Sequence, residues 1–212
     1  MKTGQPKWRR RSDARPGEII AAALAVFAEK GFAGARLDDI AARAGISKGA
    51  LYLYFETKDE LFKAVVREAV APNLDLVEGL VAQSVLPFDT LVRLLFARLG
   101  EILVETRLGA VAKMVIGESR NFPELARVWH DDVVSRGLAV ITGAIAAAQA
   151  RGEVRPGDPR LYAFSLMGPV LMGVIWREVF APIGAPGPDL KALLAQHADT
   201  VLAGLRVPEP TS

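Results

Sequence analysis

The sequence predicts an all-α protein, in which a small N-terminal domain of three short helices precedes a larger helical domain. Aromatic residues make up only 7% of the chain, and its many alanines and leucines favour helix over sheet. Apolar residues recur at helical spacing along most of the 212 residues. Nowhere do apolar and polar residues alternate for long enough to indicate a strand. Together these observations predict the fold class.

The first helix is expected to begin at Pro16, because proline suits the first turn of a helix. It is expected to end at Gly31, since glycine commonly terminates helices. Between these two residues an apolar stripe would face the core: Ile19, Ile20, Ala23, Leu24 and Phe27.

Two short helices are expected next, over residues 37–44 and 48–55, with Gly45 in the tight turn between them. Ser47 can cap the second of these helices, because its hydroxyl can accept a free backbone N–H. On spacing alone, this unit fits either an ordinary helical hairpin or the helix-turn-helix of DNA-binding proteins. Short side chains near the start of the second helix suit approach to a major groove. Its exposed residues are expected to be Ser47, Lys48, Gly49, Ala50, Tyr52 and Tyr54.

Thr57 and Glu60 have the spacing of a capping box, so a fourth helix is expected to begin there. Pro72 is expected to kink or interrupt that helix. Helical patterns then resume between breaks rich in proline and glycine, over residues 73–83, 88–106, 108–119, 123–150, 159–180 and 188–205. We therefore expect a flexible arm over residues 1–14, a first domain over 15–71 and a second over 72–207.

Charge is distributed unevenly along the chain. The net charge is +2, but residues 1–15 carry +5, so the remainder carries −3. Such a basic arm either solubilises the chain or follows DNA phosphates beside the helix-turn-helix. Cysteine is absent, which excludes disulfides and thiolate sites and fits a reducing cytoplasm. The longest apolar run, residues 164–176, is too short to span a bilayer, so no membrane partner is expected.

The segment from about Pro16 to Val66 resembles the DNA-binding domain of the TetR family of bacterial transcriptional regulators. The matching pieces are I-I-A-A-A-L-A-V-F-A-E-K-G-F at 19–32, D-D-I-A-A-R-A-G-I-S-K-G-A-L-Y-L-Y-F at 38–55 and K-D-E-L-F at 58–62. The resemblance implies a cytoplasmic homodimer that represses transcription from a palindromic operator in double-stranded DNA. It also implies release by a small hydrophobic effector and no cofactor. The alternatives are an activator or a ligand-unresponsive DNA-binding protein of the same fold.

The resemblance also assigns DNA contacts to individual residues. Base edges and the adjoining backbone would be contacted by Ser47, Lys48, Gly49 and Ala50. Phosphates would be contacted by Arg36, Tyr52, Tyr54 and Lys58. Leu37 stands at a contact position where the family often has Thr or Ser, whose hydroxyl can reach a phosphate. Leucine has no hydroxyl, so that contact is in question here.

The second domain is expected, by the resemblance, to bind the effector and to dimerise. Methionine and tryptophan suit an adaptable apolar pocket, although each such residue also fits a plain core. The pocket candidates are Met114, Trp129, Phe164, Met167, Met172 and Trp176. The last two long helices are more apolar than one buried face requires, so they are expected to form a four-helix dimer interface. Its residues would be Leu166, Val170, Leu171, Val174, Ile175, Leu190, Leu193, Leu194, Val201 and Leu202.

An enzyme is the competing class. The sequence has no G-x-S-x-G elbow, P-loop or dinucleotide fingerprint, and its two histidines, His130 and His197, lie far apart. Asp131 and Asp132 adjoin His130, but neighbouring residues on a helix point about a third of a turn apart and converge poorly on a metal. We therefore expect no catalytic and no metal site.

Overall fold

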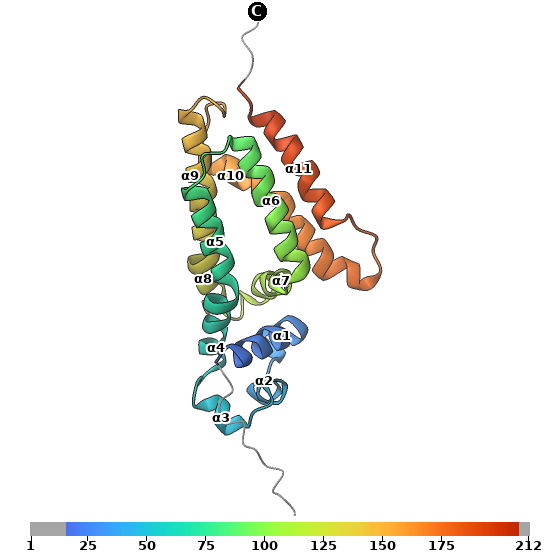
Figure 1. Ribbon diagram of the computed structural model, residues 1–212. Helices are drawn as coiled ribbons and strands as arrows, with labels where there is room; N and C mark the ends of the chain where they lie inside the picture. Colours follow the sequence, from blue (N-terminus) through green and yellow to red (C-terminus); the bar gives the residue numbers. More distant parts are fainter. Residues whose placement is uncertain (1–15, 208–212) are drawn as a thin grey trace, which may run out of the picture.

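The computed structural model describes residues 16–207, and every regular element in that range is helical (Figure 1). A head formed by the first helices lies below a body formed by the later ones. The head contains α1 (Pro16–Gly34), α2 (Leu37–Ala44), α3 (Lys48–Tyr52) and α4 (Lys58–Val65). The body contains α5 (Ala71–Ala82), α6 (Phe88–Glu105), α7 (Leu108–Glu118), α8 (Pro123–Trp129), α9 (Ser135–Ala150), α10 (Pro159–Ile175) and α11 (Leu190–Leu205). The prediction of an all-helical fold is confirmed.

Local sequence signals act as expected in the head. Gly45 ends α2 in the left-handed conformation, with φ 70°. The backbone N–H of Ala50 donates to the Ser47 hydroxyl over 3.2 Å, so Ser47 caps α3. Thr57 caps α4 in the same way, accepting from the N–H of Glu60 over 3.1 Å. The regular part of α3 ends at Tyr52 and is shorter than the 48–55 that we expected.

Of the two outcomes expected at Pro72, a kink or an interruption, the structure excludes the interruption. The chain stays helical from α4 through a π turn, η1 (Val66–Val70), into α5. In this turn the N–H of Ala71 donates to Val66, five residues back. A proline ring normally clashes with the carbonyl four residues before it. The wider π turn directly before Pro72 therefore explains how the helix accommodates it.

Two further π turns lie within runs that the sequence predicted as single helices, residues 123–150 and 159–180. They are η2 (His130–Val134), between α8 and α9, and η3 (Trp176–Phe180), after α10. A short 3₁₀ turn, η4 (Ala181–Ile183), follows η3. By length and composition, the runs Pro123–Ala150 and Pro159–Ile183 could each cross a membrane, and a single chain buries only 11% and 22% of their most apolar windows.

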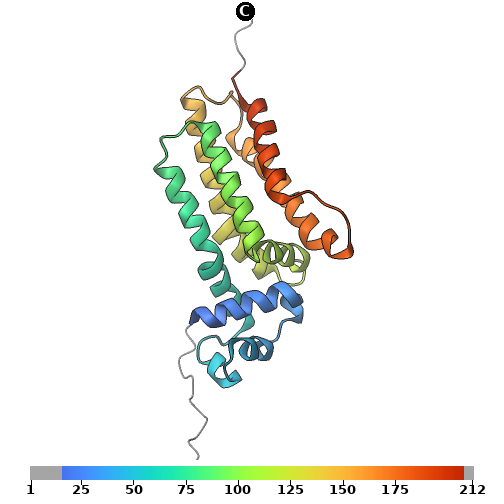
Figure 2. The same ribbon diagram turned by 45° about the vertical axis from the view of Figure 1, so that its right-hand side comes forward.

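The core of the head includes residues from the body. Phe27, Phe32 and Phe62 are buried together, with ring centroids 5.6–6.0 Å apart. The same cluster contains Val111, Met114 and Val115 of α7 and Leu125 of α8. Figure 2 shows α1, in blue, lying across the base of the body below α7. Head and body therefore share one continuous hydrophobic contact.

A second core lies inside the body between α6, α9, α10 and α11. It contains most of the residues that we assigned to a dimer interface, so this assignment needs correction. Residues buried within a single chain are Leu166, Val170, Val174, Leu190, Leu194 and Leu202; Val201 and Leu193 pack against them partly buried. A side chain enclosed by its own chain cannot also form the contact surface of a second copy.

The outward side of α10 carries a different apolar stripe. Its residues, here termed the α10 face, are Leu161, Phe164, Gly168, Leu171, Met172 and Val179, all exposed. Their spacing of three, four and seven residues places them along one side of the helix and its continuation. Of the expected interface residues, only Leu171 belongs to this exposed set.

Candidate nucleic-acid interface

The start of α3 forms an open surface at the far end of the head. Ser47, Lys48 and Gly49 are exposed, and a side chain added at Gly49 would meet nothing within 4 Å. Leu51, in contrast, is fully buried and anchors α3 on the head core. A helix held by one buried side and presenting its first turn outward has the geometry of a recognition helix.

The remaining expected contact residues lie around this turn. Tyr52, Tyr54 and Arg36 are exposed, whereas Ala50 and Leu37 are half-buried. Leu53, which we did not expect, is the most exposed large apolar residue of the head, at 84%. The basic arm of residues 1–14 lies outside the described residues, so its expected role stays a prediction.

Lys48 is held by an acidic residue of α2. Its Nζ lies 2.8 Å from Oδ1 of Asp38, and it also lies 6.0 Å from the ring centroid of Tyr52. The hydrogen bond to Asp38 raises the pKa of Lys48 above its ordinary value. The ammonium is thus charged at neutral pH and stands on the exposed side of the helix-turn-helix.

Lys58 serves the structure of the head itself. Its Nζ donates to the carbonyls of Phe32 and Ala35, the latter over 3.1 Å, and lies 4.5 Å from the Phe32 ring centroid. It is half-buried. The expected phosphate contact through Lys58 would therefore require an ammonium that already binds the end of α1.

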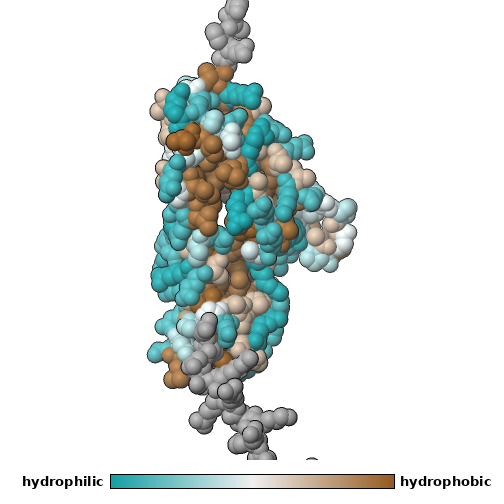
Figure 3. All heavy atoms as spheres, viewed as in Figure 1, coloured by the Kyte–Doolittle hydropathy of each residue, from teal (hydrophilic) through white to brown (hydrophobic). Residues whose placement is uncertain are grey.

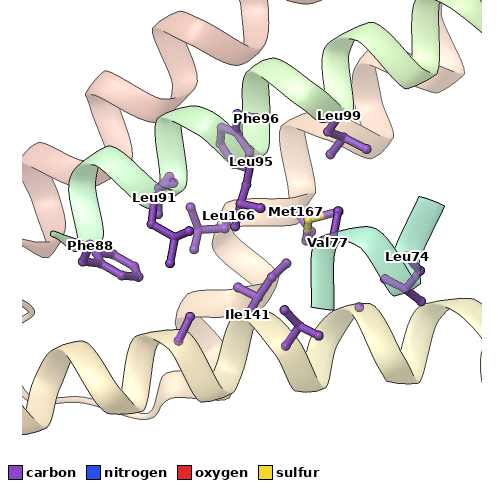
Figure 4. Close-up of a pocket in the computed structure, with 14 residues that line it drawn as sticks. Leu74, Val77, Phe88, Leu91, Leu95, Phe96, Leu99, Ile141, Leu166 and Met167 are labelled. Carbon is purple, nitrogen blue, oxygen red and sulfur yellow. The ribbon is translucent and has the colours of Figure 1, made fainter. Parts of the chain in front are cut away.

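An apolar cavity of about 140 Å³ lies in the body between α5, α6, α9 and α10 (Figure 4). No charged or polar side chain is among the residues that line it. These are Leu74, Val77, Phe88, Leu91, Val92, Leu95, Phe96, Leu99, Gly137, Val140, Ile141, Ala144, Leu166 and Met167. The sequence predicted a helix over residues 88–106 but gave no sign of this cavity.

The six expected pocket residues do not come together. Only Met167 lines the cavity. Met114 and Trp129 pack in and against the core of the head, while Phe164 and Met172 are more than half exposed on the α10 face. Trp176 lines a separate hollow beside Gly187 and Pro188, near the start of α11.

The histidines have local partners within the described part of the chain. His130 Nδ1 lies 2.8 Å from the carboxylate of Asp131, while Asp132 pairs with Arg67 of η1 over 3.5 Å. The two neighbouring carboxylates thus point to different partners. His197 contacts the carbonyl of Leu166 over 3.1 Å and stacks on Phe96.

A helix-turn-helix head with an open recognition helix, joined to a helical body with an apolar cavity, defines a DNA-binding transcriptional regulator. Sequence profiles agree. Residues 19–65 match that of bacterial regulatory proteins of the tetR family, and residues 91–203 match the C-terminal domain of AefR-like transcriptional repressors. The chain belongs to the tetR family, whose members are regulators rather than enzymes.

Similar proteins include repressors and ligand-bound regulators. The transcriptional repressor BepR of Brucella suis is 26% identical over 199 residues, covering 90% of this chain and 91% of BepR. SmeT is the repressor of a Stenotrophomonas maltophilia multidrug efflux pump. Its complex with triclosan has a TM-score of 0.67 at 27% identity, covering 93% of this chain and 98% of the SmeT chain. The regulator FadR of Bacillus subtilis, in complex with stearoyl-CoA, shares the fold with a TM-score of 0.74 at 21% identity, covering 91% and 100%.

Other similar proteins match over a shorter stretch. One, a transcriptional activator, is 45% identical over 58 residues, and the chain spans 26% of its length.

Proposed function

We propose that this protein is a cytoplasmic repressor, which binds a palindromic operator as a homodimer and is released by a small apolar effector. The open first turn of α3 is the observation that carries the DNA-binding part. The exposed Ser47, Lys48 and Gly49 would meet base edges in the groove, and the exposed Tyr52, Tyr54 and Arg36 around them would contact phosphates. Ala50 and Leu37 lie beneath this surface, half-buried.

The α10 face is the surface that we assign to the dimer. Its residues, apart from Gly168, carry large exposed apolar side chains along one side of the helix, and such patches often mark a contact with another protein surface. The exposed side of α11 presents small residues, among them Ala192, Ala203 and Gly204, which allow close helix approach. Two copies joined by α10 and α11 about a two-fold axis would form a four-helix bundle. This symmetry is that of a palindrome.

The cavity in the body is the proposed effector site. An apolar cavity of about 150 Å³ can hold a benzene-sized molecule, so 140 Å³ accepts a single ring or a short alkyl chain without expansion. A purely apolar lining offers no partner for a charged group, and burying such a group unpaired is costly. The effector is therefore a neutral apolar molecule, or presents an apolar part to the cavity.

The effector would reach the cavity between α5 and α6. An outer groove, lined by Leu76, Leu80 and Leu94 among others, runs along this seam, where Figure 3 shows hydrophobic residues gathered. Leu91 lines both the groove and the cavity. α5 is tied to α9 by Arg136, which pairs with both Asp75 and Glu78. Glu78 is not among the residues that line the groove, so opening on the α6 side would leave its ion pair intact.

Selection of bound duplexes from a random-sequence pool tests the DNA-binding proposal. The expected product is a palindrome whose half-sites lie about one helical turn apart, bound by two copies of the chain. Duplexes without a common motif would overturn it. Activation is the second candidate, since a transcriptional activator is among the similar proteins. A reporter placed behind the selected palindrome separates the two: deleting the gene raises expression for a repressor and lowers it for an activator.

A further inference from the structure

A single carboxylate from the body holds the end of α1. Glu118, the last residue of α7, accepts from the backbone N–H of Phe32 through Oε1 over 2.8 Å. Its Oε2 accepts from the N–H of Ala33 over 2.7 Å. Both oxygens of one side chain are thus engaged by consecutive amides that lie 85 and 86 residues away in sequence.

Gly31 explains why those two amides are free. Its φ of 70° and ψ of 175° break the regular helix, and residues 31–35, here termed the elbow, form a new turn. Amides at the start of a helical turn have no acceptor in their own helix. A side chain at position 31 would collide with Oε1 of Glu118, so glycine is required both for the backbone conformation and for the carboxylate.

The elbow is held on its other side by Lys58 of α4, which binds the carbonyls of Phe32 and Ala35. Arg36 follows immediately and leads into α2. The elbow therefore lies at the point where the chain passes from α1, packed on the body, to the helix-turn-helix. A second polar link lies nearby: Arg107, just before α7, and Arg43 of α2 both contact Glu29, over 3.1 and 2.6 Å.

We propose that Glu118 is a positioning residue for DNA binding, which fixes the orientation of the head on the body by binding the elbow. It touches no DNA. In a dimer the orientation of each head sets the separation of the two recognition helices, which must match about one turn of DNA. α7 packs against α10, where Gly109 leaves space for Val174, and α10 also lines the cavity. The link from Glu118 to operator spacing and to the cavity rests on the proposed function, whereas the role of Glu118 in orienting the head does not.

The orientation can be measured in the protein alone. The chain has no cysteine, so Leu53→Cys in the head and Ile183→Cys in the body, 84% and 79% exposed, would carry the only two spin labels. Labelled chain diluted with unlabelled chain gives an intramolecular head-to-body distance by pulsed electron resonance. We expect a single narrow distribution in the parent and a broadened or shifted one in Glu118→Gln, because an amide can accept only one of the two bonds well.

Matched variants separate positioning from folding. Within residues 16–207, Glu124 forms an ion pair only with Arg127 on α8, so Glu124→Gln should leave the distance unchanged. Glu118→Asp keeps the charge but is one methylene shorter, so it should also broaden the distance if Glu118→Gln proves unstable. In Gly31→Ala the added Cβ should displace the Glu118 carboxylate from the elbow, so this variant should also broaden or shift the distance distribution. A parent-like distribution in folded Glu118→Gln or, if that variant is unstable, in folded Glu118→Asp would overturn the proposal.

DNA binding gives a second readout. Affinity for a random duplex should stay within about two-fold in Glu118→Gln, since the charges of the recognition surface are unchanged. Affinity for a selected palindrome should fall by at least about five-fold, the lower end of typical coupling between sites. Equal losses on both duplexes would contradict a positioning role. Failure to select any palindrome would contradict the proposed function, but the distance measurement would still test the role of Glu118 in orienting the head.

Discussion

The Nζ atom of Lys48 lies 2.8 Å from the carboxylate of Asp38, so the cation at the start of the recognition helix is paired with an acid of the preceding helix. Both side chains are exposed. A phosphate that approaches Lys48 must compete with Asp38 and is also repelled by it. We expect Asp38→Asn to bind DNA about two- to five-fold more tightly. The exposed Lys48–Asp38 ion pair contributes little to folding stability, whereas the charge of Asp38 opposes the binding of a phosphate. Fluorescence anisotropy with a labelled duplex would measure this, and weaker binding would show that Asp38 instead positions Lys48.

The same pair predicts how binding responds to pH. Asp38 raises the pKa of Lys48, and a raised lysine pKa keeps the charged form present at higher pH. The favourable contribution of the Lys48 charge to DNA affinity is complete below the ordinary pKa of lysine. It is lost only as the pH rises through the raised pKa of Lys48. The difference in affinity between the parent and Lys48→Ala should therefore be constant from about pH 6 to 9. A difference that disappears within that range would contradict the assignment.

The basic arm predicts salt-dependent affinity. Deleting residues 1–14 removes five of the six cations that precede α1 and leaves Arg15. The slope of log affinity against log salt should become shallower by about 0.9 for each phosphate that the shortened chain no longer neutralises. Titrations of a generic duplex at several salt concentrations would measure the slope. An unaltered slope would mean that the arm does not contact DNA.

The α10 face predicts which substitutions separate the subunits. Phe164→Glu and Leu171→Glu place a charge on that exposed stripe and should give folded monomers in light scattering. Leu76→Glu, at an equally exposed position on α5, is the control and should remain dimeric. Leu194→Glu, in contrast, should unfold the chain, because Leu194 is 1% exposed in the body core. If both α10 variants remain dimeric, the α10 face is not the dimer interface.

The cavity predicts a matched pair of substitutions on α9. Ala144 lines the cavity, whereas Ala147, three residues on, is exposed. Ala144→Phe should fill the space and abolish the thermal stabilisation that small apolar probes, such as toluene or hexanol, give the parent. Ala147→Phe should keep that stabilisation. If Ala144→Phe still responds as the parent does, the probes bind elsewhere.

The head was largely predictable from sequence because its signals are local. Gly45, Ser47 and Thr57 act through the backbone of their immediate neighbours, so residue type and spacing suffice. Glu118 could not be found in this way, since its partners are the backbone amides of a turn far away in sequence, and any residues can supply amides.

The body was less predictable because α10 is apolar on every side. Leu166 faces the core and Phe164 faces outward, yet nothing in their residue types separates the two faces. The helical pattern therefore predicted the helix but not which of its sides faces the core. The cavity depends on how far α5 stands from α6, a property of tertiary packing that no local pattern records.

The most direct test of α3 as the DNA-reading element is the affinity of point variants for the selected palindrome. Tyr52→Phe removes only a hydroxyl, and removing one such hydrogen bond should cost on the order of 1–3 kcal/mol. Lys48→Ala should also weaken binding, whereas Lys113→Ala, exposed on α7 of the body, should not. The account predicts weaker binding by Tyr52→Phe and Lys48→Ala with unchanged folding. Parent-like affinity in both would contradict the placement of the recognition helix.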